Sequence, residues 1–377
     1  MKNIPFFRSN ITDEDKSLVN RTLEDFSYEP AREFEEDIVR FFNKKYAIVT
    51  DNGTSAQHLA LCAMDIKRAD KIICSVNSFP SVAEVIRHFD AEPIPVDIDE
   101  HDFNIDPNKL EDALKKHNHK KLKAAFITHI AGVSAKMDEI YDIAKRYDIK
   151  IIDDASRAMG ATYKNQKIGS HDDSFISCFQ INPQFENTIA TAGFFTTNDD
   201  ETAHRAKLIR SHAIVSSKSK DGSLDYIYDV VDIGQRYNLS GICAAFAKSQ
   251  FGKTADFIKR RKEIAKIYDK ELADCPHVTI PAKNKDHIYT QYIVKIDRNR
   301  DNFAKKLKEL GVSVSLHYIP LHLLTYYKQK YDFKVNDFPV ALKTYQQVLS
   351  LPIYADLSDE EVYYVCEKVK QVAKNHV

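Results

Sequence analysis

Two turns in the sequence carry side chains that could bind an anion or a charged ring. In the first, Asn52-Gly53-Thr54-Ser55 follows an apolar stretch and precedes a helical pattern that begins at Ala56. A strand-to-helix junction presents free backbone N–H groups and the positive end of the helix dipole, so the hydroxyls of Thr54 and Ser55 would complete a phosphate site. The same residue types are equally typical of an ordinary helix cap.

The second turn contains two adjacent carboxylates. Asp153-Asp154-Ala155-Ser156-Arg157 follows the predicted strand Lys150-Ile151-Ile152, and a carboxylate at this position would face the crevice at the end of that strand. One chemical use of Asp154 is an ion pair with a protonated pyridine nitrogen, which keeps a pyridoxal ring electron-withdrawing. The alternative is that Asp154 caps a helix, and the turn taken alone favours that interpretation.

The elements that would position these turns alternate between strand and helix patterns. Helical patterns, such as residues 137–147, separate six short apolar runs at residues 46–50, 71–76, 93–98, 123–128, 150–153 and 174–179. This alternation predicts an α/β fold with a mostly parallel central sheet and helices on both faces. Ligands of such sheets bind at the carboxyl ends of the strands, where both turns lie.

The pattern changes near residue 251. A long charged helix over 254–272 is followed by a strand over 289–296, a helix over 300–310 and a closing helix over 358–374. We therefore expect a large domain over residues 1–250 and a smaller α+β domain over residues 251–377. In the long helix, Lys259-Arg260-Arg261-Lys262-Glu263 mixes both charges, which is typical of a solvated helix face.

The composition excludes several classes of protein. The 377 residues include 54 Lys and Arg against 55 Asp and Glu, so the chain has no basic surplus for binding nucleic acid. No apolar run approaches the ~20 residues that a transmembrane helix needs, and the first residues lack the apolar core of a signal peptide. The six cysteines are scattered without a C-x-x-C pair, which indicates thiols in the reducing cytoplasm rather than disulfides or a metal site.

These segments, taken in order, resemble a known family. The resemblance extends over essentially the whole chain and includes Phe34-Glu35, Asn52-Gly53-Thr54-Ser55-Ala56, Ser78-Phe79, Lys136-Met137-Asp138-Glu139-Ile140, Asp153-Asp154-Ala155-Ser156, Gly160-Ala161-Thr162-Tyr163, Arg210-Ser211-His212, Ala244-Ala245, His317-Tyr318-Ile319-Pro320-Leu321-His322 and Leu351-Pro352-Ile353-Tyr354. The sequence is similar to the DegT/DnrJ/EryC1/StrS sugar aminotransferases, which are fold-type I enzymes dependent on pyridoxal phosphate (PLP). The resemblance implies a fold-type I aminotransferase-like architecture, Phe79 stacked on a cofactor ring, and a homodimer whose active sites take residues from both subunits. The resemblance is strongest to the branch of the family that aminates 4-keto nucleotide-hexoses for surface glycans.

The family's central motif differs in this chain. That motif reads approximately F-S-F-x-P-x-K, in which the Ser holds the cofactor phosphate and the Lys forms the Schiff base. Residues 179–185 read Phe-Gln-Ile-Asn-Pro-Gln-Phe, so Gln180 stands at the serine position and Phe185 at the lysine position. A phenyl ring cannot condense with an aldehyde or carry a proton. The alignment therefore predicts a protein without covalent attachment of PLP.

Other positions near the expected cofactor differ as well. Arg157 stands where the family usually has Gln or His beside the ring, and Arg236 stands where it has the Asn that contacts the neighbouring subunit's phosphate. Only Lys164 or Lys167, in a hairpin-like segment, could replace the lost amine, because no further lysine occurs before Lys207. We expect PLP or pyridoxamine phosphate (PMP), if either binds, to be held non-covalently; the site could also work without a cofactor.

Three hypotheses about function remain open. In the first, the protein acts on a keto nucleotide-sugar without an internal aldimine, and the base is His129, His212 or His317. Each lies near a predicted strand end, where a histidine is more often structural than catalytic. In the second, it is an inactive pseudo-enzyme that binds a sugar nucleotide or pairs with an active paralogue. The third, a conventional PLP-dependent sugar transaminase, is least favoured because it needs a lysine.

Overall fold

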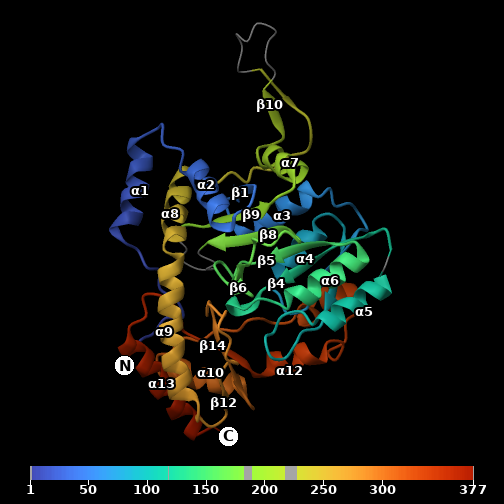
Figure 1. Cartoon of the computed structure of the whole chain (residues 1–377). Helices are drawn as coiled ribbons and strands as arrows, with labels where there is room; N and C mark the ends of the chain where they lie inside the picture. The colour runs from blue at the N-terminus through green and yellow to red at the C-terminus, as the bar shows by residue number, and fades with distance from the viewer. Residues whose placement is uncertain (1, 118, 182–188, 217–226, 377) are drawn as a thin grey trace.

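The computed structural model describes residues 2–117, 119–181, 189–216 and 227–376. The large domain is built on a seven-stranded sheet with the order β1-β9-β8-β5-β4-β2-β3 (Figure 1). Its strands are β1 (Tyr46–Thr50), β2 (Lys71–Ser75), β3 (Glu92–Val96), β4 (Leu122–Thr128), β5 (Lys150–Asp154), β8 (Ser174–Ile181) and β9 (Ala192–Thr197). Strand β9 is antiparallel to both neighbours and all other pairs are parallel. The expected mostly parallel sheet is confirmed.

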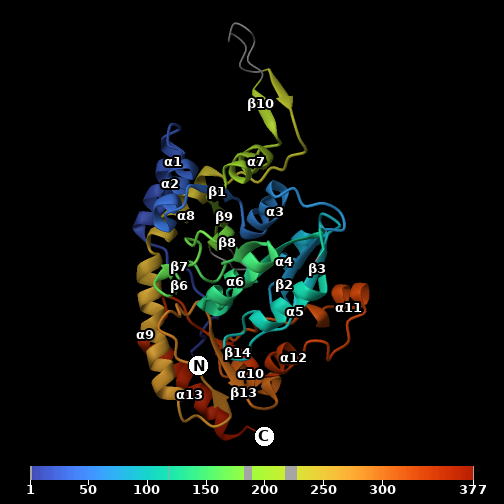
Figure 2. The same ribbon diagram turned by 45° about the vertical axis from the view of Figure 1, so that its right-hand side comes forward.

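Helices cover both faces of this sheet (Figure 2). One face packs against α2 (Pro30–Phe42), α5 (Pro107–His117), α6 (Met137–Tyr147) and α8 (Gly241–Gly252), and the other against α3 (Gly53–Ala63), α4 (Pro80–Arg87) and α7 (Asp200–Arg210). Successive strand residues point to opposite faces of the sheet. Ile73 packs in the hydrophobic core under α2, α5, α6 and α8, whereas its neighbours Ile72 and Cys74 pack in the core under α3, α4 and α7. This alternation is that of strands buried on both sides.

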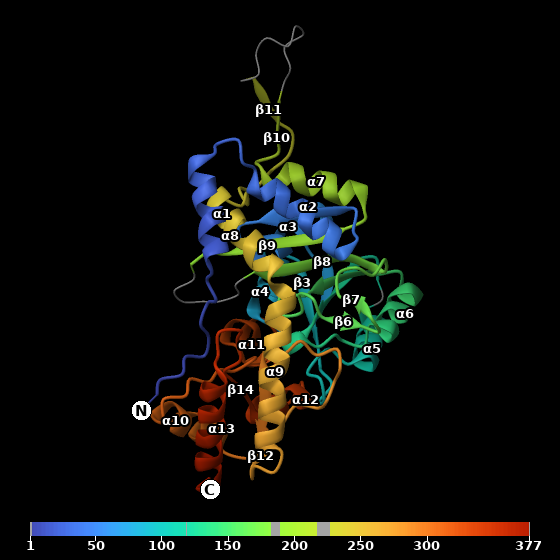
Figure 3. The ribbon, with the colours of Figure 1, turned by 60° about the vertical axis from the view of Figure 1, so that its left-hand side comes forward.

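The smaller domain contains a three-stranded antiparallel sheet, formed by β12 (Val278–Thr279), β13 (Tyr292–Ile296) and β14 (Val348–Leu351). Helices α9 (Thr254–Leu272), α10 (Arg300–Glu309) and α13 (Asp359–Lys374) surround a separate hydrophobic core there. Only Lys253 separates α8 from α9, so these two helices run along one side of the molecule and connect the domains (Figure 3). Helices α11 (Thr325–Tyr331) and α12 (Pro339–Gln347) instead contribute Tyr327 and Ala341 to the core of the large domain.

The first residues of the chain lie with the smaller domain. The Ile4 amide donates to Gly311 O at 2.8 Å, and the Ser313 amide donates to Ile4 O at 3.0 Å. The Ile4 side chain is buried in the core of the smaller domain. The division expected from the sequence, 1–250 and 251–377, assigned these residues to the large domain. Their position is set by long-range pairing of backbone groups that would otherwise lack partners, which no local pattern reveals.

Two further features project from or flank the large domain. Helix α1 (Asp13–Glu24) packs against α8, and β10 (Ile214–Ser216) and β11 (Tyr228–Val230) form a two-stranded ribbon that extends away from the rest of the molecule (Figure 1).

Across the described ranges, no helix is both long and apolar enough to cross a membrane. Within the same ranges, no group of three or more His, Cys, Asp or Glu side chains could hold a metal ion.

Candidate functional site

A cavity of about 520 Å³ lies between the strand ends of the large domain and the smaller domain. Its lining comes from segments that are far apart in the sequence: Phe6, Phe7, Arg8, Asn10, Ser156, Arg157, Met159, Gln180, Ile181, Gln250, Thr254, Phe257, Arg261, Thr290, Gln291, Ser315, His317, Ile353, Tyr354 and Ala355. Three of these described residues are arginines, and none is Asp, Glu or Lys. The cavity therefore favours an anionic ligand.

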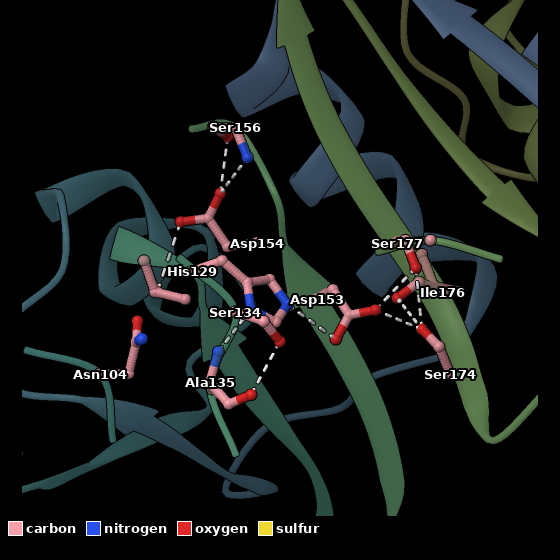
Figure 4. A network of polar contacts seen from close by, with 12 residues as sticks. Asn104, His129, Ser134, Ala135, Asp153, Asp154, Ser156, Ser174, Ile176 and Ser177 are labelled. Atoms are coloured by element: carbon pink, nitrogen blue, oxygen red, sulfur yellow. Dashed lines mark hydrogen bonds and ion pairs between the residues drawn. The ribbon is translucent and has the colours of Figure 1, made fainter. Parts of the chain in front are cut away.

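Asp154, the last residue of β5, is buried and precedes Ser156 by two positions. Its Oδ1 accepts hydrogen bonds from Ser156 Oγ at 2.6 Å and from the Ser156 amide at 3.3 Å, and its Oδ2 lies 3.4 Å from Thr128 Oγ1 (Figure 4). Ser156 lines the cavity. Asp154 is thus connected to the cavity through its hydrogen bonds with Ser156.

A buried polar network lies on the opposite face of β5, as Figure 4 shows. Asp153 is 1% exposed, and its Oδ2 accepts hydrogen bonds from Ser174 Oγ at 2.5 Å and Ser177 Oγ at 2.7 Å. Its Oδ1 lies 3.4 Å from His129 Nε2. Burial alone would raise the pKa of Asp153, but the contacts with His129 and the two serines outweigh burial and lower it.

His129, one of the three candidate bases, is part of this network and does not line the cavity. Its side chain is fully buried, and its Nδ1 accepts a hydrogen bond from the Ala135 amide at 3.1 Å. Because Nδ1 acts as an acceptor, the proton of the neutral ring is on Nε2, which faces Asp153. The geometry gives His129 a positioning role at the end of β4 and β5.

Of the three candidate histidines, His317 alone lies among the described residues of the cavity lining. Its Nδ1 is 2.8 Å from Ser350 Oγ. Burial, assisted by the charge of Arg157, lowers the pKa of His317 to about 3. The imidazole is therefore neutral at physiological pH, and such a low pKa makes it a weak base that is better suited to hydrogen bonding.

Two predicted residues lie on the segment that follows α7, away from the cavity lining. His212 and Arg236 are both exposed. The His212 amide donates to Gln235 O at 2.9 Å, and Ser211 forms a β-bridge with Arg236. This segment forms the base of the β10–β11 ribbon. Its exposure is compatible with the expectation, drawn from the resemblance, that Arg236 serves a neighbouring subunit.

Phe79 lies at the start of α4, half-buried, as the residue before the first turn. Its ring centroid is 6.0 Å from that of Tyr318, and their planes are inclined at 61°. Tyr318 directly follows His317. The aromatic side chain expected to stack on a cofactor is thus close to the segment that carries the cavity histidine.

A backbone N–H group of the turn before α3 already has a hydrogen-bond acceptor within the chain. Asn52 Oδ1 accepts a hydrogen bond from the Ser55 amide at 2.9 Å, which is the helix-cap alternative for this turn. A Cβ atom added to Gly53 would lie 2.8 Å from both Cβ and Oε1 of Gln180. The Gln180 side chain therefore lies against the first turn of α3, the turn in which Thr54 and Ser55 were expected to hold a phosphate. Asp154 could accept a hydrogen bond from a protonated pyridine nitrogen, but the residues present at the turn before α3 do not fit the phosphate of PLP or PMP.

The position that should carry the Schiff-base lysine, Phe185, lies outside the described residues. The two nearest lysines are engaged elsewhere, in the hairpin of β6 (Thr162–Tyr163) and β7 (Gln166–Lys167). Lys164 pairs with Asp138 and is exposed, and Lys167 Nζ donates to Phe41 O at 2.9 Å. No lysine is present in the described part of the cavity lining.

Sequence reasoning missed three polar residues of the cavity. Arg261 was expected on a solvated helix face, but burial lowers its pKa to about 10 and its Nε donates to Ile288 O at 3.0 Å. Gln291 is 1% exposed, and neither its Nε2 nor its Oε1 has a partner in the described structure. The Tyr354 hydroxyl is likewise buried without a partner there, and burial raises its pKa to about 12. The motif Leu351-Pro352-Ile353-Tyr354 was the one available signal.

Comparison with known proteins identifies the family of this chain. The model of the DegT/DnrJ/EryC1/StrS aminotransferase family matches residues 9–370. The chain is 32% identical to spore coat polysaccharide biosynthesis protein SpsC of Bacillus subtilis, covering 98% of this chain and 97% of that protein. It is 30% identical to UDP-4-amino-4,6-dideoxy-N-acetyl-beta-L-altrosamine transaminase of Campylobacter jejuni, covering 98% and 99%.

A solved structure gives the same result for the fold. PseC of Helicobacter pylori, an aminotransferase involved in the biosynthesis of pseudoaminic acid, superposes with a TM-score of 0.89 at 25% identity, covering 99% of this chain and 100% of that one. The expected fold-type I architecture is confirmed. With a family match from residue 9 to residue 370 and relatives of at least 30% identity over almost the full length, the chain belongs to the DegT/DnrJ/EryC1/StrS aminotransferase family.

Proposed function

We propose that this protein acts on a keto nucleotide-sugar in polysaccharide biosynthesis, without an internal aldimine. The family and its relatives support the substrate class, since they are nucleotide-sugar aminotransferases. The sequence supports the missing aldimine, since Phe185 stands at the position of the lysine. The alternative is a sugar-nucleotide-binding partner subunit without catalysis, and a conventional PLP-dependent transaminase is third.

The observation that carries the proposal is the unmet polar capacity of the small-domain wall, by which we mean Arg261, Gln291, His317 and Tyr354. Gln291 and Tyr354 each bury polar atoms without a partner in the described structure. A buried polar group without a partner costs about 1–3 kcal/mol, so a ligand that supplies partners gains free energy there. Hexose hydroxyls both donate and accept, which suits an amide and a phenol.

The arginines on the cavity differ in how far their charge is neutralised. Arg8 pairs with Glu361 at 2.9 Å and with Asp356 at 3.6 Å. Arg261, in contrast, has a backbone carbonyl as its acceptor, and among the described residues no carboxylate pairs with it. A guanidinium in this state is suited to an anionic group. We assign the diphosphate of the nucleotide-sugar to Arg261.

The resemblance also supports a homodimer, and the exposed apolar side chains of the large domain are consistent with one. Phe26 is 97% exposed and Ile233, beside the β10–β11 ribbon, is 83% exposed. Covering these side chains with another subunit would remove apolar surface from water. We propose that a second copy covers this surface and brings Arg236 to the neighbouring cavity. The six free cysteines fit a reducing cytoplasm.

The test measures ligand binding and turnover separately. Wild-type protein is titrated calorimetrically with UDP- and GDP-hexoses in reduced and 4-keto forms, and turnover of bound ligands is followed by NMR. Arg261→Gln should weaken binding by about tenfold or more, the worth of one charge-assisted contact. Arg260→Gln is the matched control, because Arg260 pairs with Asp359 and is not part of the cavity lining.

Each outcome of that test decides something. Binding with turnover supports the enzyme, and binding without turnover across the panel supports the non-catalytic partner. Equal affinity in Arg261→Gln and Arg260→Gln would contradict the assignment of the diphosphate. A lysine adduct with PLP that borohydride can fix would restore the conventional transaminase.

A further inference from the structure

Gln180 occupies a position where two parts of the candidate site meet. It is the seventh of the eight residues of β8 and pairs with Gly193 of β9. Its side chain is half-buried and lines the cavity. On its other side it lies against Gly53, in the first turn of α3, where an added Cβ would meet its Cβ and Oε1 at 2.8 Å. Gln180 is thus placed between the cavity and the start of α3.

The turn that Gln180 covers cannot move away to make room. A Cβ added to Gly193 would lie 2.1 Å from Asn52 O, so β9 packs directly on the back of the turn. Thr50 Oγ1 donates to Asn52 O at 2.8 Å, and Thr191 Oγ1 donates to Asp51 O at 2.9 Å. These contacts fix the turn against the sheet. An anion could be seated only if the Gln180 side chain moved.

The hydrogen-bonding capacity of the turn is also reduced. The Ser55 amide, one of the free donors that a helix start normally offers to an anion, already donates to Asn52 Oδ1 at 2.9 Å. A phosphate would have to displace this cap as well as the Gln180 carboxamide. Both displacements oppose binding, because each gives up contacts that the chain makes without a ligand.

We propose that Gln180 closes the start of α3 to phosphate groups and so determines which ring compounds this protein can hold. The protein then gains no affinity from a 5′-phosphate, and a pyridine ring beside Asp154 is bound equally well with or without one. This inference is independent of the residue at position 185 and of the identity of the nucleotide-sugar, because it concerns a different group at a different place.

The experiment compares two ligands that differ only in the phosphate. PMP and pyridoxamine carry no aldehyde, so neither reacts with the many lysines of the chain. Their dissociation constants are measured by isothermal titration calorimetry on the full-length wild type, Gln180→Ser and Gln180→Glu. Serine opens the turn and adds a hydroxyl donor. Glutamate keeps the size of glutamine but repels an anion, which makes it the matched control.

Wild type and Gln180→Glu should bind PMP no more tightly than pyridoxamine. In Gln180→Ser, PMP should bind about tenfold more tightly than in wild type while pyridoxamine is unchanged, since one or two charge-assisted hydrogen bonds become possible. Gln180→Ala, which opens the turn without adding a donor, replaces the serine variant if that variant does not fold.

Two results would overturn the inference. If wild type binds PMP at least tenfold more tightly than pyridoxamine and Gln180→Glu loses that preference, the phosphate is already seated and Gln180 is one of its ligands. If neither opened variant gains affinity for PMP, another feature excludes the phosphate. Inorganic phosphate is also added as a competitor, to wild type and to Arg261→Gln. Because Arg261→Gln affects only binding to the cavity arginines, this comparison separates that binding from binding at α3.

Discussion

The two walls of the cavity differ in how far their polar groups are already satisfied. On the large-domain wall, made of Asp154, Ser156, Gln180 and the start of α3, Asp154 accepts from Ser156 and the Asn52 side chain caps its own helix. On the small-domain wall, Gln291 and Tyr354 bury polar atoms without partners in the described structure. A satisfied group gains little from a ligand, whereas an unsatisfied one gains the full contact. Affinity for a ligand should therefore come mainly from the small-domain wall.

The largest expected effect tests the support behind the large-domain wall. Asp153→Ala should lower the free energy of unfolding by about 3–5 kcal/mol, because His129, Ser174 and Ser177 all lose their buried acceptor. Ser177→Ala should cost only about 1 kcal/mol, since Ser174 remains. Urea denaturation at pH 7 measures both.

The pH dependence of that effect has a definite sign. The contacts of Asp153 lower its pKa in the folded state, so its stabilising contribution is present above the pKa of the unfolded chain and is lost as the pH falls through the folded value. The difference between wild type and Asp153→Ala should narrow in acid. A difference that is constant from pH 7 to pH 3 would contradict an ionised Asp153.

His317 provides a titration on the small-domain wall. Its pKa is lowered from 6.5 to about 3, so between these values the unfolded chain binds a proton that the folded protein does not, and stability falls as the pH falls. At pH 5 this loss is about 2 kcal/mol. His317→Gln should therefore lose about 2 kcal/mol less than wild type between pH 7 and pH 5, measured by urea denaturation. His212→Gln, at an exposed position, is the control and should follow wild type.

The contact between Gln180 and α3 can be measured without any ligand. Gly53→Ala should destabilise the protein by about 1–2 kcal/mol, because the new Cβ overlaps the Gln180 side chain. The same substitution in Gln180→Ser should destabilise the protein less, because serine lacks the Oε1 atom but keeps the Cβ atom that the new methyl group meets. Thermal unfolding of the four proteins completes a double-mutant cycle. Additive effects would mean that the two residues are not in contact.

The smallest expected effect is a change in the free energy of unfolding that has opposite signs for the two walls of the cavity. Gln291→Leu should leave the free energy of unfolding unchanged or raise it by about 1 kcal/mol, because an unpartnered amide is removed, yet it should weaken nucleotide-sugar binding. Ser156→Ala, on the large-domain wall, should instead lower stability by about 1 kcal/mol through the lost bond to Asp154. If Gln291→Leu destabilises the protein and leaves ligand affinity unchanged, Gln291 is a structural residue and the comparison of the walls fails.

The local patterns of the sequence were sufficient for the fold. Alternating apolar runs and helical patterns predicted the mostly parallel sheet, and the short strand pattern Lys150-Ile151-Ile152 placed Asp154 at a strand end. These signals extend over a few residues each, so one chain contains them. The ordered set of motifs then gave the family, which the comparisons confirmed.

The positions of individual side chains were predicted less well. The charged run at residues 259–263 was expected to be a solvated face, but Arg261 points into the cavity from that helix. His129 and His317 were predicted on the same grounds, as candidate bases near strand ends. In the structure His129 lies in a buried polar network, whereas His317 lines the cavity. The pattern around each residue could not distinguish these outcomes, because burial depends on segments that are distant in the chain.

The sequence by itself predicted the alternation of strands and helices, although not strand β9, and it determined the carboxylate at the end of β5 and the absence of a lysine from residue 168 to residue 206. The tertiary structure alone decided that Gln180 lies against Gly53 and that Arg261, Gln291 and Tyr354 share one cavity. The physical reason is range: hydrophobic periodicity and capping act between neighbours in the chain. Steric closure of a turn and unmet hydrogen bonds arise only when residues far apart in sequence are packed together.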